Sequence, residues 1–160
     1  IAHVPELTAE HLAAAKTLGI GLALHGFRYL SGSTRGGPPY RMILESGIKV
    51  GAGSDSAQIS TLNPWNMIYY MVTGKNAAGI PVNKDQTIGR EQAVRLYTAA
   101  NGWFMREEDR IGSIEPGKLG DLVVLDRDLF DPAKVPDEAI RQVRPAMTIV
   151  GGKMVYGTDA

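Results

Sequence analysis

The sequence contains no cysteine, which excludes disulfide bonds and limits any metal site to nitrogen and oxygen ligands. It also lacks an excess of charge, because 17 basic and 17 acidic side chains balance. That balance gives no reason to expect nucleic acid or an anionic membrane as a partner. No apolar run reaches the ~18 residues of a membrane-spanning helix. The absence of cysteine favours a cytoplasmic location.

A starting methionine is also missing, and the chain opens within an apolar stretch, residues 1–4, that is typical of a strand. A strand with nothing before it usually has its partner upstream, so we expect a fragment of a longer protein. Exposed edges of an incomplete sheet favour self-association. We therefore expect either a homo-oligomer or association with the missing N-terminal part.

The first half of the chain alternates short apolar runs with amphipathic stretches, a pattern typical of βα units on a parallel sheet. Thr8 and Asn63 precede two of the expected helices, and their side chains can accept hydrogen bonds from the free backbone N–H groups there. The predicted elements are strands at 1–4, 20–24 and 48–52 and helices at 9–18, 39–47 and 65–73.

The character of the chain changes near residue 108. Helices are predicted at 91–99 and 100–105, followed by a Pro-Gly turn, a strand at 121–126 and a hairpin at 147–150 and 153–156. These patterns divide the chain into a βα region, residues 1–108, and a small β module, residues 109–160. Three βα units are too few to close a barrel of about eight strands.

Asp55 is the most informative single residue of the chain. It follows the apolar run 48–53, at the C-terminal end of a predicted strand, where parallel α/β folds place their chemistry. Gly51 and Gly53 leave room for a metal ion or a substrate to approach the backbone. The alternative, on this stretch alone, is an aspartate that caps a turn or the following helix.

The string IGSIEPGKLGDLVVLD, with a histidine and an aspartate at strand ends, resembles the amidohydrolase superfamily, in particular the branch that includes the N-substituted formamide deformylases. GAGSDS matches the segment at that family's eighth barrel strand, and PAMTIVGGKMVY matches its last hairpin. The resemblance covers nearly the whole chain but only the C-terminal part of a family member. It implies an α/β fold: the C-terminal portion of a distorted TIM (β/α)8 barrel, then part of a small β-sandwich.

The resemblance also implies an activity, the hydrolysis of non-peptide carbon–nitrogen bonds (amide or cyclic amide) of a small-molecule substrate by metal-activated water. His3 falls where the family places a metal-binding histidine, and Asp55 falls where an aspartate touches the metal and shuttles a proton. His25, Arg28 and Ser56 are the candidate substrate-binding residues. Histidine and carboxylate donors favour zinc and also admit manganese, iron or nickel.

Two departures and two alternatives accompany this interpretation. Ala2-His3-Val4 stands where the branch usually shows Glu-His-Ala, and Leu24-His25-Gly26 stands where it tends to carry Gln-Pro. One alternative is a non-catalytic assembly or binding protein of the same fold that lacks the metal site. The other assigns His3 to a structural hydrogen bond and His25 to a packed loop. His11 is predicted to lie on a helix face, without a functional role.

Overall fold

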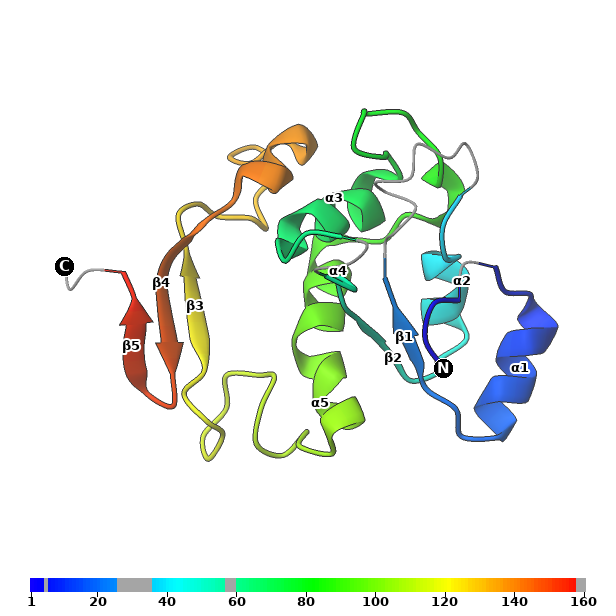
Figure 1. Cartoon of the computed structure of the whole chain (residues 1–160), viewed down its shortest axis with the longest axis horizontal. Helices are drawn as coiled ribbons and strands as arrows, with labels where there is room; N and C mark the ends of the chain where they lie inside the picture. The colour runs from blue at the N-terminus through cyan, green and yellow to red at the C-terminus, as the bar shows by residue number, and fades with distance from the viewer. Residues whose placement is uncertain (5, 26–35, 57–59, 158–160) are drawn as a thin grey trace.

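The computed structural model describes residues 1–4, 6–25, 36–56 and 60–157, which form a mixed α/β structure (Figure 1). None of the helices in these ranges is long and apolar enough to cross a membrane. Figure 1 shows a small parallel sheet and an antiparallel sheet on opposite sides, with α3, α4 and α5 between them. In chain order the elements are α1 (Ala9–Thr17), β1 (Leu22–Leu24), α2 (Tyr40–Glu45), β2 (Val50–Ala52), α3 (Pro64–Thr73), the 3-10 helix η2 (Lys84–Gln86), α4 (Arg90–Tyr97), α5 (Ala99–Met105), β3 (Leu122–Leu125), the 3-10 helix η3 (Asp137–Gln142), β4 (Pro145–Val150) and β5 (Lys153–Tyr156).

The parallel sheet brings three chain segments side by side. β1 pairs with β2 in parallel, and Ala2 forms an isolated parallel bridge with Ala23 of β1. Of the strand predicted over residues 1–4, Ala2 alone pairs. His3 has a positive φ of 61°, which turns the backbone out of the extended conformation. The C-terminal ends of all three segments therefore lie at the same edge of the sheet.

The helix starts follow the predicted caps. Thr8 Oγ1 accepts from the backbone N–H of His11 at 3.2 Å, and His11 Nδ1 accepts from the backbone N–H of Thr8 at 3.3 Å. This reciprocal pair is a capping box, and it gives His11, which is exposed on α1, a structural role at the start of the helix. Asn63 Oδ1 caps α3 by accepting from the N–H of Trp65, and Gly74 ends that helix with a φ of 67°.

The core is centred on α3, whose residues 67–71 are all buried. A helix buried on every side is enclosed by its neighbours, and α3 packs against both α4 and η3. Burying each large apolar side chain stabilises the fold by roughly 1.5–3 kcal/mol. The other elements contribute, among others, Leu22, Leu24, Ile43, Val50, Leu96 and Ile140.

The antiparallel sheet has the order β3-β4-β5 and contains the predicted hairpin. Gly151 and Gly152 connect β4 to β5 with φ values of 56° and 77°, the positive values that tight two-residue turns require. Its strands expose large apolar side chains, including Val123, Val155 and Tyr156. An exposed apolar surface of this kind often marks a site where another chain or domain packs. Association with another chain and the domain boundary at 108 both stay predictions.

The close approach of α5 to β2 leaves no room for a side chain at Gly51. A Cβ there would lie 2.2 Å from Asn101 Oδ1 and 2.9 Å from the ring of Phe104. We expect Gly51→Ala to lower the free energy of unfolding by about 1–3 kcal/mol, because overpacking displaces α5 from the strand. Chemical denaturation measures this loss. Gly53→Ala is the matched control, since a Cβ at Gly53 meets no atom of the described residues within 4 Å. Equal losses in the two variants would contradict the packing argument.

Candidate metal centre

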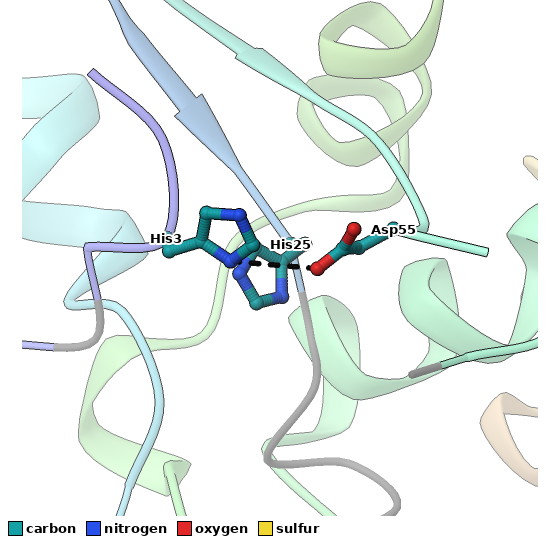
Figure 2. Close-up of side chains that lie close together, drawn as sticks. All are labelled: His3, His25 and Asp55. Carbon is teal, nitrogen blue, oxygen red and sulfur yellow. Dashed lines mark ion pairs between the residues drawn. The ribbon is translucent and has the colours of Figure 1, made fainter. Parts of the chain in front are cut away.

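Three side chains meet at the C-terminal edge of the parallel sheet, and we call them the His3–His25–Asp55 cluster. His3 follows the bridge residue Ala2, His25 directly follows β1, and Asp55 comes shortly after β2. Each residue offers one ligand atom, and the three atoms all lie within 4.8 Å of one another. Figure 2 shows the three side chains directed toward a common point.

The contacts within the cluster are close. His3 Nδ1 lies 3.4 Å from Asp55 Oδ2. The imidazole rings of His3 and His25 meet edge to face, with their centroids 4.4 Å apart and an interplanar angle of 74°. Exposure differs within the cluster, since the His3 side chain is 56% exposed whereas His25 is 7% exposed.

Two of the three residues hold an unusual backbone conformation. His3 has a φ of 61° and Asp55 a φ of 51°, both in the left-handed region. In the described part of the chain, the other non-glycine residue with a positive φ is Arg106, which ends α5. A left-handed residue with a side chain costs roughly 1–2 kcal/mol, and such strain is concentrated at active sites and ligand clamps. The strain therefore marks this edge of the sheet as a candidate functional site.

The carboxylate of Asp55 fits a cation. Its Oδ2 atom is shielded from solvent and accepts no hydrogen bond from the residues that the structure describes. A buried acceptor without a hydrogen-bond donor destabilises the folded protein by about 1–3 kcal/mol, and by more when it is charged. A divalent cation removes this cost. Together with two imidazole nitrogens, the carboxylate completes a donor set that suits zinc.

The surroundings of His25 favour the neutral form of its imidazole. Burial lowers the pKa of the His25 imidazole below its usual value of 6.5, and the neighbouring His3 lowers it further. Asp55 acts in the opposite direction, as the smallest of the three influences. The neutral imidazole is the ligating form, so the shift favours metal binding at neutral pH.

Two side chains from the helices that follow hold the segment between β2 and Asp55. The hydroxyl of Tyr97 donates to the carbonyl of Gly53 at 3.2 Å, and Asn101 Nδ2 donates to the carbonyl of Ala52 at 3.0 Å. Burial raises the pKa of Tyr97 well above its usual value, so the hydroxyl remains a donor. The sequence predicted the two helices but not these contacts, since no local pattern links a helix face to a strand end.

The structure brings three of the predicted site residues together. His3 and Asp55, the predicted metal ligands, lie together. His25, predicted to bind substrate, lies beside them in the same cluster. Ser56 is half-buried and forms a β-bridge with Ser60. Arg28 lies outside the described residues.

The sheet and the cluster define an α/β protein with a candidate metal centre where parallel α/β folds place their reactive groups. A family model described as "Amidohydrolase family" matches residues 1–156. The chain belongs to the amidohydrolase family, and the resemblance identified in the sequence is confirmed.

Individual relatives are longer than this chain. An N-substituted formamide deformylase from Arthrobacter pascens is 30% identical over 118 residues, which cover 74% of this chain and 21% of the relative. The structure of an uncharacterized metal-dependent hydrolase from Pyrococcus furiosus matches with a TM-score of 0.67 and 25% identity, over 82% of this chain and 28% of that one. The structure of an atrazine chlorohydrolase from Arthrobacter aurescens complexed with zinc has a TM-score of 0.73 and 20% identity. The match covers 98% of this chain and 35% of that one. The chain thus spans about a fifth to a third of the length of these relatives.

Proposed function

We propose that the protein is a metal-dependent hydrolase of non-peptide carbon–nitrogen bonds, amide or cyclic amide, in which Asp55 shuttles the proton. The observation that carries the proposal is the His3–His25–Asp55 cluster. Its Asp55 Oδ2 is shielded from solvent without a hydrogen-bond donor in the described residues, and it lies 3.4 Å from His3 Nδ1. Membership of the amidohydrolase family supports the hydrolytic chemistry.

In this mechanism His3 and Asp55 would hold the divalent cation, with zinc as the favoured metal. When bound, the cation would supply a Lewis acid that polarises the scissile carbonyl and lowers the pKa of water to about 7. Asp55 takes a proton from the attacking water and delivers it to the departing nitrogen as the carbon–nitrogen bond breaks. The water oxygen stays on the carbonyl carbon, so the products are a carboxylic acid and an amine.

The Arthrobacter pascens relative supports small N-substituted formamides as the first substrates to try. Their hydrolysis yields formate and an amine. Arg28 and Ser56 complete the proposed site as substrate contacts. The guanidinium of Arg28 is suited to pair with a substrate carboxylate.

The architectural part of the proposal concerns the whole protein. Residues 1–108 supply the last βα units of a distorted TIM barrel, and residues 109–160 supply part of a β-sandwich. The parallel pairing of β1 with β2 and the antiparallel order β3-β4-β5 support this assignment. The non-catalytic alternative requires that the His3–His25–Asp55 cluster bind no cation. The cytoplasmic location of the protein stays a prediction.

The activity is tested with zinc-loaded protein and a panel of N-substituted formamides and small cyclic amides, by following the release of amine and acid. We expect acid and amine in equal amounts from at least one formamide. For a cyclic amide, the two groups remain on one ring-opened product. Protein that binds no divalent metal and hydrolyses no member of the panel would instead support the non-catalytic alternative.

A further inference from the structure

His25 has a place in the cluster that the substrate-binding role does not explain. It continues directly from β1, the middle one of the three parallel segments, so its neighbours on both sides are the segments that carry His3 and Asp55. The hydrogen bond from the backbone N–H of Gly53 to the carbonyl of Leu24, at 2.9 Å, extends the pairing of β1 with β2 up to His25. The backbone therefore fixes the imidazole between the other two donors (Figure 2).

The distances suit a shared ion. Bonds of about 2.0–2.1 Å to a tetrahedral zinc place two ligand atoms about 3.3 Å apart. His3 Nδ1 and Asp55 Oδ2 are already 3.4 Å apart. The greatest separation within the cluster is at most 4.8 Å, so a shared ion requires a side-chain rotation that shortens it by up to about 1.5 Å.

The ring orientations lead to the same conclusion. The lone pair of an imidazole nitrogen lies in the plane of its ring, so two rings stacked flat on each other cannot direct lone pairs at one point. The rings of His3 and His25 instead meet at 74°, with their centroids 4.4 Å apart. This is an arrangement in which two in-plane nitrogens can converge.

Burial argues against a primary role in contacting substrate. A side chain that selects substrates presents its polar atoms to the cavity in which the substrate lies. His25 is only 7% exposed, whereas the His3 side chain is 56% exposed and the Asp55 side chain 32% exposed. His3 and Asp55 are therefore the more accessible members of the cluster to a substrate, and His25 is the least accessible.

We propose that His25 is a direct ligand of the divalent cation, together with His3 and Asp55. The chain then supplies two imidazole nitrogens and one carboxylate oxygen to a single ion. Catalytic zinc sites typically combine three protein ligands with an open position, and two histidines with one carboxylate also suit iron(II). The inference rests on the metal-dependent function proposed above, but it assigns His25 to the ion and not to the substrate.

Zinc binding by the purified protein tests this assignment, with His25→Gln as the main variant. Glutamine keeps a polar side chain of similar reach but offers no imidazole nitrogen. His11→Gln is the matched control, because it makes the same chemical change on the exposed surface of α1, where glutamine can still complete the capping box. X-ray absorption at the zinc edge counts the imidazole ligands, and a competition assay with a chelating dye gives the zinc affinity.

We expect one imidazole ligand fewer in His25→Gln than in the wild type and in His11→Gln. We also expect the affinity for zinc to fall by more than the roughly 10- to 100-fold that follows loss of a group outside the coordination shell. In a second variant, His25→Ala with cobalt(II), added free imidazole is expected to restore the wild-type visible spectrum, because it can occupy the vacated position. This rescue also shows that the variant is folded.

The outcomes separate this inference from the proposed function. If the wild type binds zinc and His25→Gln keeps both the imidazole count and the affinity, His25 is not a ligand, although the metal-dependent function stands. The same holds if imidazole leaves the spectrum of the cobalt-loaded His25→Ala variant unchanged. If the wild type binds no zinc, both proposals are overturned.

Discussion

Asp55→Asn is expected to reduce kcat by at least about 100- to 10,000-fold, the range that loss of a general acid–base group typically causes. Asparagine has the shape of aspartate but cannot accept the proton from water, and its neutral amide is a weaker metal ligand. The φ of 51° at this position does not compromise the variant, because asparagine adopts left-handed backbone more readily than most residues. The fold should therefore survive the loss of activity.

Steady-state kinetics on a small amide substrate, with circular dichroism to verify folding, measures this effect. Asp109→Asn is the matched control, since Asp109 is an exposed carboxylate outside the cluster. It should retain wild-type kcat. A kcat for Asp55→Asn within a few-fold of the wild type would exclude Asp55 as the proton shuttle and leave the capping aspartate as the better interpretation.

Removal of the metal is expected to eliminate turnover and also to destabilise the folded protein. A ligand present at 1,000 times its dissociation constant stabilises the native state by about 4.1 kcal/mol, provided that the unfolded chain does not bind it. For a domain of 150–250 residues, each kcal/mol shifts Tm by about 2–4 °C, so chelation should lower Tm by about 8–16 °C. The destabilisation arises because removal of the cation leaves the shielded Asp55 Oδ2 without a positive charge beside it.

Thermal unfolding with and without chelator, followed by the return of zinc, checks this expectation. Both activity and Tm should recover when zinc is restored. In Asp55→Asn the chelator should change Tm much less than in the wild type, because the carboxylate that the cation neutralises is absent. A wild-type protein whose activity and Tm are indifferent to exhaustive chelation would contradict the proposed metal centre.

The local parts of the fold could be predicted because local chemistry decides them. The cap of α1 by Thr8, the start of α3 after Asn63 and the turn at Gly151-Gly152 depend on side chains and φ angles within a few residues. The strands predicted at 1–4, 20–24, 48–52 and 121–126 were too long, whereas β4 is longer than predicted and β5 has the predicted bounds. An apolar run shows which residues favour an extended conformation, but a strand needs a neighbour, and in residues 1–4 only Ala2 pairs.

The candidate site was predictable in part. Asp55 could be chosen because it follows a short apolar run, and His3 because of its place in the resemblance to the amidohydrolase superfamily. The structure places His3 Nδ1 and Asp55 Oδ2 3.4 Å apart. The contribution of Tyr97 could not be foreseen, because its hydroxyl meets the carbonyl of Gly53 only after α4 packs against β2. His25 could be chosen as a residue of interest, but its neighbours depend on how the strands align.

The sequence by itself determined the chemistry available to this protein: nitrogen and oxygen donors, no thiol, polar groups at the ends of apolar runs, and caps that start the helices. The tertiary structure decided which donors meet. His3, His25 and Asp55 are far apart along the chain, and parallel pairing through Ala2, β1 and β2 brings their ligand atoms within 4.8 Å. Register is a property of hydrogen bonds between strands, and no single strand contains it.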